Sequence, residues 1–425
     1  MNEYFLHFIW EHQYFHKQDL KNSQGESLTV LHPGYRNTDQ GPDFSHARLL
    51  MQQIEWHGNI EIHLKASDWH LHKHNGDKNY DTILLHVVWE NDCQIKREDE
   101  TIIPVLELKG RVDLDFIDKY RTFINSGIQL PCQYYLKEID PVYVNEMFVR
   151  VLDERLERKG KEVLNLYEKN QHDWEETFWQ VFVGNFGFKI NNEAFAMLGR
   201  ILPFKILLKH SNNQKQLEAL LFGQSGLLED APEEAYVIEL KKEYKFLAHK
   251  YSLEQTKMSS HWWKFLRTRP YNFPTIRLAQ LAALLQQCDL LINIIYRKDD
   301  LKEYLSSLQA KVSLYWQEHY HFGEKIKGEV PNFSETAAYN IILNVVIPFK
   351  IARYLAGISE QYPEEVYTLL RKIPSEVNKL TKQWKTTGVP LQNAFDSQAS
   401  IELYNQYCLK RKCLYCSIGN RIIKN

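Results

Sequence analysis

The pattern of apolar and polar positions divides the chain into two parts that differ in secondary structure. Before about residue 135, short segments alternate with period 2 or are continuously apolar, as strands do. These segments are 27–31, 44–51, 60–65, 82–90 and 101–109, and an amphipathic helix precedes them at 3–16. Beyond that point helical spacing predominates, in 142–166, 174–186, 217–222, 235–251, 278–295, 301–316, 337–356, 363–372 and 398–410. We therefore expect an α/β domain with a mixed sheet over 1–135 and a larger, mostly α-helical domain over 136–425.

One segment, IEIHLK at 60–65, predicts a strand whose polar side chains share one face. Strict alternation places Glu61, His63 and Lys65 on that face and the apolar residues between them on the other. The preceding strand begins just after Pro42-Asp43, so a hairpin would bring Asp43 near Glu61. Two carboxylates beside a strand-borne cation suit a divalent metal and an attacking water. We expect a catalytic site there, and the alternative is a hairpin whose polar face is solvated.

Histidines are dense around this strand. They are His57, His63, His70, His72, His74 and His86. A helix starting at Ser67 or Asp68 would put His70 and His74 on one face, because they are four positions apart, and would point His72 elsewhere. Imidazoles at this density suit Zn²⁺, Mn²⁺ or iron. The alternative is that several of them hydrogen-bond the backbone or stack on tryptophan.

A second candidate metal site lies at the C-terminus, in the spacing Cys408-x4-Cys413-x2-Cys416. Thiolates at such spacings are typical of Zn²⁺ or iron–sulfur ligation. A tetrahedral site needs a fourth ligand, and Cys132, just past the α/β segment, is our first choice. The alternative is a set of ordinary reduced cysteines.

Basic residues interleaved with aromatic ones indicate contacts with nucleic acid. Arg267, Arg269 and Arg277 lie among tryptophan, tyrosine and phenylalanine, which could stack on bases while the arginines contact phosphate. The tail adds Lys410, Arg411 and Lys412. The alternative for the arginines is a structural role at the start of a helix that begins at Pro274.

Composition sets broad limits on these predictions. The chain has 425 residues, a formal net charge of −2 and 44% hydrophobic residues, which are ordinary globular values. A charge near zero argues against nucleic-acid binding over the whole surface. No basic leader precedes the first helix, no apolar run reaches membrane-spanning length, and six cysteines are few for a secreted scaffold. We expect a cytoplasmic location.

Several long motifs in a fixed order resemble a bacterial family known as domain of unknown function 2851. The motifs are GPDF at 41–44, EIH at 61–63, SDWHLHKH at 67–74, LHVVW at 85–89, NFGFKIN at 185–191, FGQSGLL at 222–228, RPYNFPTIRLAQLA at 269–282 and YCLKRKCLYC at 407–416. The resemblance covers nearly the whole chain. It implies no activity, because none is assigned to the family.

The N-terminal segment also resembles, more distantly, the PD-(D/E)xK nuclease superfamily. Pro42-Asp43 matches the first part of its motif and Glu61 the acidic member of the second, whereas His63 stands where lysine is usual and Lys65 follows two positions later. The resemblance implies that Asp43 and Glu61 hold Mg²⁺ or Mn²⁺, and that an acid on the first helix, Glu3 or Glu11, supports them. Some of these nucleases carry an iron–sulfur cluster with a similar cysteine layout.

The favoured function is therefore metal-dependent cleavage of phosphodiester bonds in DNA or RNA. Two rival functions remain open. One is a non-catalytic scaffold of the same fold that binds nucleic acid or protein, and His63 in place of lysine favours it. The other is a histidine-ligated metallohydrolase that acts on a small molecule.

Overall fold

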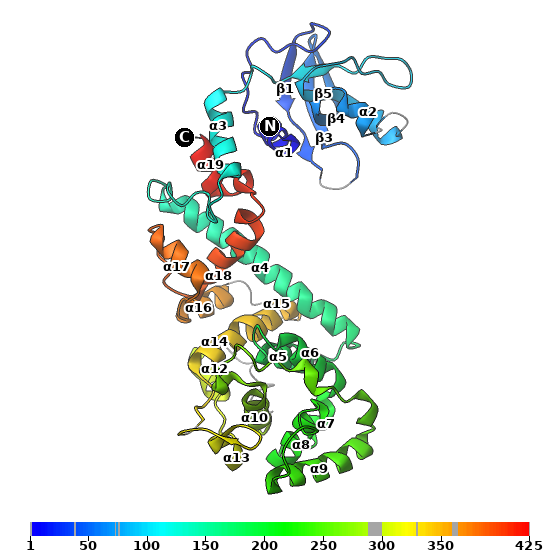
Figure 1. Cartoon of the computed structure of the whole chain (residues 1–425). Coiled ribbons are helices and arrows are strands. Elements are labelled where there is room, and N and C mark those ends of the chain that lie inside the picture. Colours follow the sequence, from blue (N-terminus) through cyan, green and yellow to red (C-terminus); the bar gives the residue numbers. More distant parts are fainter. Residues whose placement is uncertain are drawn as a thin grey trace. The chain divides into compact units, whose positions relative to one another are not determined.

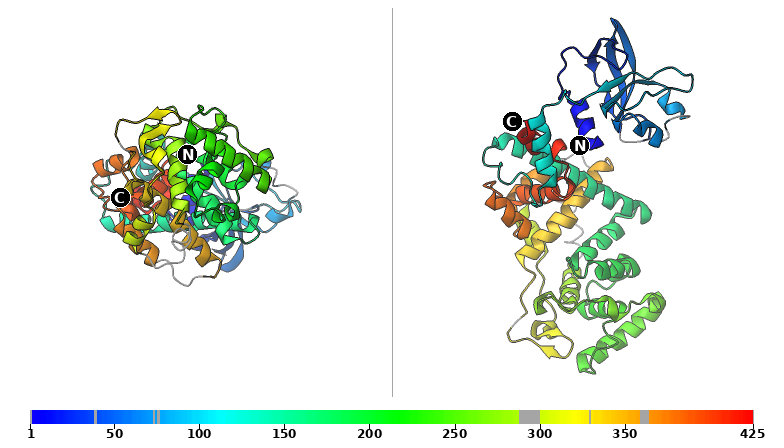
Figure 2. Two further views of the ribbon diagram at one scale, coloured as in Figure 1. Left: turned by 90° about the horizontal axis from the view of Figure 1, so that it is seen from below. Right: turned by 45° about the horizontal axis from the view of Figure 1, so that its top comes forward.

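The computed structural model describes residues 2–37, 40–72, 74, 77–287, 300–328, 330–358 and 364–424. The chain divides into two compact units, each shown in Figures 1 and 2. Unit 1 consists of Met1–Met147, Thr386–Val389 and Leu403–Asn425. Unit 2 consists of Phe148–Lys385 and Pro390–Glu402. The C-terminal segment thus belongs with the α/β part of the chain, whereas the sequence pattern assigned it to the helical domain.

Unit 1 is built on a mixed sheet, as the sequence predicts. Its six described strands are β1 (Leu28–His32), β2 (Tyr35–Arg36), β3 (Phe44–Met51), β4 (Ile54–Lys65), β5 (Ile83–Glu90) and β6 (Val105–Glu107). The strand order is β1-β3-β4-β5-β6, and β2 pairs with β3. β1, β2 and β4 run antiparallel to β3, whereas β5 runs parallel to β4 and β6 parallel to β5.

The β3–β4 hairpin has a two-residue turn that fixes the register of the sheet. Gln52 and Gln53 have positive φ angles of 50° and 69°, the twist that a tight turn between right-twisted strands requires. Met51 pairs with Ile54 across this turn, and Phe44 pairs with Ile60 at the far end after an irregularity. That register sets the start of β3 beside the middle of β4.

Helices of unit 1 come from both ends of the described chain. They are α1 (Glu3–Glu11), α2 (Asp68–Leu71), α3 (Leu114–Asn125) and α19 (Ser417–Lys424), with short 3₁₀ segments at Lys78–Tyr80 and Cys413–Tyr415. α1 starts at an Asn2 cap whose side chain accepts a hydrogen bond from the Phe5 N–H, and the helix packs against β4. α19 lies against α3, as both views show.

Unit 2 is helical, as the periodicity predicts, apart from one small hairpin. α4 (Pro141–Lys169) begins in unit 1 and continues into unit 2. The other α-helices are α5 (Trp174–Phe186), α6 (Asn192–Ile201), α7 (Phe204–Leu208), α8 (Gln214–Gln224), α9 (Ala235–Tyr251), α10 (Pro274–Leu285), α12 (Leu301–Ser307), α13 (Leu314–Glu318), α14 (Glu335–Ile341), α15 (Ile347–Leu355), α16 (Glu364–Lys372), α17 (Lys379–Thr386) and α18 (Ala394–Leu403). The hairpin pairs β7 (His319–His321) with β8 (Glu324–Lys325).

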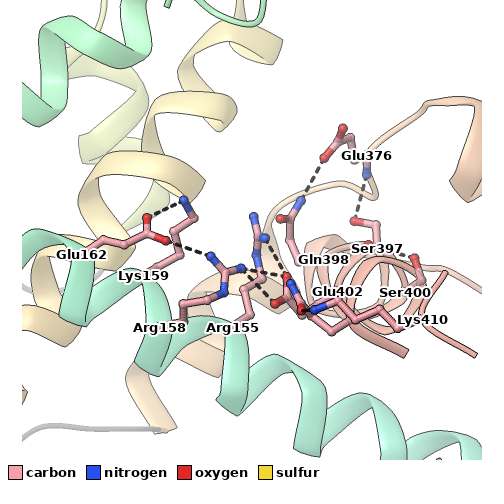
Figure 3. Close-up of polar contacts among 11 residues, drawn as sticks. Arg155, Arg158, Lys159, Glu162, Glu376, Ser397, Gln398, Ser400, Glu402 and Lys410 are labelled. Carbon is pink, nitrogen blue, oxygen red and sulfur yellow. Dashed lines mark hydrogen bonds and ion pairs between the residues drawn. The ribbon is translucent and has the colours of Figure 1, made fainter. Parts of the chain in front are cut away.

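A buried acid joins two helices of unit 2. Glu402 on α18 is 2% exposed and receives hydrogen bonds from Arg155 and Arg158 of α4, with N···O distances of 3.2 and 2.9 Å (Figure 3). Arg158 also donates to Glu162 one turn further along α4. Because two guanidinium groups compensate one buried carboxylate, the end of α18 is held against α4 by charge as well as by packing.

Several predicted elements differ in extent from the observed ones. The 301–316 segment forms two short helices, α12 and α13, with non-helical residues between them. The second half of 278–295 lies outside the described residues. The strand predicted at 101–109 is reduced to Val105–Glu107, because Pro104 has no N–H for the ladder. Within the described residues, none of the helices combines the length and the apolar character needed to cross a bilayer.

Candidate functional site

The candidate site lies on one face of the sheet in unit 1, at the middle of β4 and β5. Glu61 on β4 is in register with His86 on the parallel strand β5, so their side chains and that of His63 share a face. The alternative left open by the sequence, a hairpin whose polar face is merely solvated, does not hold at the centre of this face. Glu61, His63 and His86 are 4%, 1% and 0% exposed. α1 and the segment around α2 cover them, because side chains from both contact this face.

Asp43, just before β3, lies beside Glu61 of β4, as the hairpin predicts. The Asp43 N–H donates to Glu61 Oε2 at 3.1 Å, and Asp43 Oδ2 accepts from the Ile62 N–H at 2.9 Å. Each carboxylate is therefore held by the backbone of the other strand. His7 of α1 approaches the same group, with Nε2 3.2 Å from Asp43 Oδ2.

Three imidazoles converge beside these carboxylates. One ring nitrogen from each of His63, His72 and His74 lies within 4.8 Å of the other two. His63 Nε2 is 3.0 Å from His72 Nδ1 and 3.7 Å from Glu61 Oε1. His74 Nε2 is 3.2 Å from the same Glu61 oxygen. The donor set thus combines nitrogen and oxygen ligands.

Aromatic rings and a further histidine pack against this cluster and orient its imidazole rings. His63 Nδ1 and His86 Nε2 are 2.8 Å apart, so one ring donates to the other. The ring of Tyr80 lies over His74 with centroids 3.9 Å apart, and Trp69 packs on both His74 and His86. A histidine that is hydrogen-bonded on one nitrogen presents the other in a fixed direction, which is the usual arrangement around protein-bound metals.

Burial favours the neutral forms of Glu61 and of three histidines, His63, His74 and His86. Burial and the nearby charge of Asp43 raise the pKa of Glu61 to about 9. Burial and the neighbouring rings of His86 and His72 lower the pKa of His63 to about 2, and burial lowers the pKa of His86 to about 3. Burial also lowers the pKa of His74. Neutral imidazoles are the form that ligates metals, and a cation in place of a proton would let Glu61 ionise.

Two contacts in the site have the distance of a hydrogen bond without its geometry. His74 Nε2 and His7 Nε2 are both buried and make no hydrogen bond, although a carboxylate oxygen is 3.2 Å from each. Imidazole nitrogens and carboxylate oxygens that lie this close without a hydrogen bond are arranged as ligands of one shared metal ion would be. The residues therefore fit a divalent ion with mixed ligands, such as Zn²⁺, Mn²⁺ or Fe²⁺, better than Mg²⁺, which prefers oxygen alone.

Two residues predicted for this site lie apart from it. Lys65 is exposed, and its charge contributes to lowering the pKa of Asp92. α2 ends at Leu71, so His70 and His74 do not share a helix face, and His70 is exposed. His72, expected to point elsewhere, is the histidine that joins His63.

Other members of the site escaped the sequence analysis or were left open by it. His7 was not predicted as a site residue, and His86 was counted in the histidine cluster without being assigned as a ligand. Glu3 is the first-helix acid that approaches the cluster, with Oε1 4.0 Å from His63 Nε2. Burial raises its pKa. The density of histidine at 57–86 was the one available signal, and it did not distinguish ligands from neighbours.

The four cysteines of the second predicted site all lie in unit 1. Cys132, Cys408, Cys413 and Cys416 are free thiols, each less than 9% exposed. Burial raises the pKa of Cys408, and the other three thiols raise it further. Burial and Cys416 raise the pKa of Cys413 to about 12. These mutual effects indicate that the thiols are neighbours, although Cys132 is more than 270 positions from the others. Among the described residues, no three of these sulfurs lie within 4.8 Å of one another, so the thiols are not gathered as tightly as around a bound ion.

Two of the three basic residues predicted in the tail, Lys410 and Arg411, have partners within the chain. Arg411 donates to the backbone carbonyls of Ser126 and Ile128 at 2.6 and 3.0 Å. Lys410 is exposed and donates to the Gln406 side chain, and Lys412 is exposed. Arg411 therefore joins the C-terminal segment to the loop after α3. Of the three arginines in unit 2 that were predicted to contact nucleic acid, Arg267 and Arg269 are exposed and Arg277 is buried.

The sequence profile of a family described as "Protein of unknown function (DUF2851)" matches residues 3–379. The match includes every residue of the carboxylate–histidine site and Cys132, and it ends before the other three cysteines. Neither a curated protein nor a solved structure matches the chain.

Proposed function

We propose that this chain, which belongs to the DUF2851 family, is a metal-dependent hydrolase that cleaves phosphodiester bonds in nucleic acid. One observation carries the proposal. His74 Nε2 and Glu61 Oε1 lie 3.2 Å apart without a hydrogen bond, inside a cluster that contains two further imidazoles and a second carboxylate. Purely structural histidines in a core are normally satisfied by hydrogen bonds.

Five side chains would hold the ion: Asp43, Glu61, His63, His72 and His74. A bound divalent ion supplies a water of lowered pKa and polarises a phosphoryl oxygen. His7 lies outside this set and contacts Asp43, so its ring is placed to take the proton that water loses on attack. The new bond joins the water oxygen to phosphorus, the ester oxygen leaves, and it takes a proton from solvent.

The nucleic-acid part of the proposal rests on the resemblance to PD-(D/E)xK nucleases. It is supported by the order of a first helix, an antiparallel hairpin and a following parallel strand, with Asp43 just before the first hairpin strand and Glu61 on the second. His63 in place of lysine remains a departure. The near-complete burial of His63 favours a second candidate, a histidine-ligated hydrolase of a small substrate. A closed site admits a small molecule more readily than a polymer.

The test begins with the metal content of the purified protein before and after chelation. The protein is then assayed with Mn²⁺ and Zn²⁺ on single- and double-stranded DNA, on RNA and on a small phosphodiester. We expect cleavage of a polymer that Glu61→Gln abolishes and His57→Ala leaves intact. His57 is a suitable control because it lies on the same strand, with a side chain 67% exposed.

Three outcomes separate the candidates. Cleavage of the small ester alone supports the second candidate. Metal binding without turnover on any substrate indicates the non-catalytic scaffold. Absence of bound metal under all conditions, in a folded protein, rejects both enzymatic functions.

A further inference from the structure

Unit 2 contains a cavity whose lining is strongly basic. It encloses about 530 Å³ and receives four cationic side chains, Lys189, Arg267, Arg269 and Arg277. None of the described lining residues is acidic. A cavity of this size is typical of small-molecule sites. The excess of positive charge indicates an anion carrying more than one negative charge.

Arg277, on α10, is the central observation. It is 7% exposed, and its guanidinium carbon lies 4.5 Å from the centre of the Phe188 ring and 5.3 Å from that of Phe333. Its terminal nitrogens donate to Gln280 Oε1 at 2.9 Å and to Asn272 Oδ1 at 2.5 Å. Its Nε is buried and has no hydrogen-bond partner.

Neutral amides are poor partners for a buried cation. A buried charge is normally paired with an opposite charge, because removing it from water costs several kcal/mol. In the described part of the chain no carboxylate forms an ion pair with Arg277, and burial lowers its pKa to about 10. The two amides fix the plane of the guanidinium while leaving its charge uncompensated. An anionic ligand in the cavity would supply the missing charge.

The walls of the cavity are held in place before any ligand binds. Asn191 donates from Nδ2 to the Lys264 carbonyl at 2.9 Å, and its Oδ1 accepts from the Lys264 N–H at 2.8 Å. This two-way bond joins the loop that carries Lys189 to the loop that carries Arg267. Lys189, Arg267 and the third cation of the rim, Arg269, are exposed. A preformed site loses little entropy on binding.

We propose that this cavity binds a phosphate monoester, with Arg277 at its base and Lys189, Arg267 and Arg269 at its rim. Guanidinium groups match the geometry of phosphate oxygens, and four cations suit a phosphate monoester better than a single carboxylate. A free nucleotide and the phosphorylated end of a strand both carry such a group. The inference concerns unit 2 alone and does not depend on the hydrolase proposed for unit 1.

Binding to the full chain is measured by calorimetry with four probes: inorganic phosphate, a nucleoside 5′-monophosphate, and two short DNA strands of one sequence with and without a 5′-phosphate. We expect the monophosphate to bind and Arg269→Ala to weaken its binding about tenfold. Arg200→Ala serves as the control, because Arg200 is an exposed arginine of unit 2 outside the lining. Binding of the phosphorylated strand alone identifies a strand end, and binding of the monophosphate alone identifies a free nucleotide.

Arg277→Gln tests the base of the cavity and is compared by its melting temperature as well as its affinity. We expect weaker binding, and no stabilisation by the monophosphate where the wild type is stabilised. If Arg277→Gln does not fold, the affinities of Arg269→Ala and Lys189→Ala for the monophosphate test the proposal instead. No binding of any probe, equal binding by Arg269→Ala and Arg200→Ala, or an effect that sodium chloride reproduces at equal ionic strength would overturn the proposal.

Discussion

Asp43 and Glu61 are 18 positions apart, and the N–H of the first donates a 3.1 Å hydrogen bond to the carboxylate of the second. The Asp43 carboxylate in turn accepts from the N–H of Ile62. Backbone donors on each strand therefore hold the side chain of the other. This arrangement fixes both carboxylates without any ion, so that a metal would meet a preorganised site and little side-chain entropy would be lost on binding.

Replacing His74 should weaken metal binding, whereas replacing His70 should not. His74→Ala removes a nitrogen within 4.8 Å of its two partners, while His70 is exposed on α2. We expect a loss in affinity for Zn²⁺ or Mn²⁺ of at least about tenfold for His74→Ala, judged from the effect of removing groups around metal sites. Competition with a chromogenic chelator measures it. Equal affinities in the two variants would exclude His74 as a ligand.

The cysteine cluster should behave as a structural metal site that stabilises unit 1. Chelation or Cys413→Ser should lower the melting temperature, because binding a structural Zn²⁺ is worth on the order of 10 kcal/mol and closing a long loop costs only logarithmically more with length. Visible absorption distinguishes an iron–sulfur cluster from Zn²⁺. Cys93→Ser is the control, since Cys93 lies near the sheet core and outside the cluster. A metal-free protein that melts as the loaded one does would leave the four thiols without this role.

The stability of unit 2 should depend on pH through Glu218. Burial raises the pKa of this carboxyl to about 7 from an ordinary 4.5. When a carboxyl group holds its proton more strongly in the folded state, the protein becomes less stable as the pH rises through that interval. The loss between pH 4.5 and pH 7 is on the order of 3 kcal/mol. Glu218→Gln keeps a neutral group in place, and should flatten the decline and raise stability at pH 8.

Denaturant unfolding across that pH range measures the effect of Glu218→Gln. The exposed residue Glu233 provides a matched control as Glu233→Gln. A wild-type curve parallel to that of Glu218→Gln would show that Glu218 ionises normally in the folded protein.

Glu402→Leu should destabilise unit 2 by about 3–5 kcal/mol, because it leaves Arg155 and Arg158 partly buried beside an apolar group. The unfolding free energy in urea measures the change. Glu157→Leu is a control on α4, the helix that carries the two arginines, since its ion pair with Lys161 is exposed on both sides. A loss no larger than that of the control would mean that water reaches the two arginines and replaces the carboxylate.

Local patterns predicted the main strands well, and tertiary contacts account for the differences. The apolar run at 82–90 became β5 within one residue. A continuously apolar segment can be recognised as a buried strand without knowing which strands pair with it. β4 is longer than predicted, since Ile54–Gly58 extends the hairpin without strict alternation. The helices α3, α6, α7, α17 and α19 were not predicted. In such helices packing supplies most of the stability, and the sequence pattern alone is weak.

The candidate site was partly predictable for similar reasons. Asp43 and Glu61 were predicted to meet because a hairpin register is local. The choice of His72 over His70 depended on where α2 ends, and a four-residue helix leaves little periodicity to show it. His7 reaches Asp43 only because α1 packs on β4, and His86 meets His63 only through a parallel strand pair. Neither contact has a local signature in the sequence.

The division of unit 1 into 1–147 and 403–425 has a consequence for synthesis. At about 5–20 residues per second, the ribosome needs on the order of 10–50 s to make the residues between these two parts. Throughout that interval Cys132 lacks its thiol neighbours, the carbonyls of Ser126 and Ile128 lack Arg411, and the face of α3 that receives α19 is bare. α3 and the loop after it therefore stay uncovered, accessible to chaperones and proteases, until the C-terminal segment has left the exit tunnel.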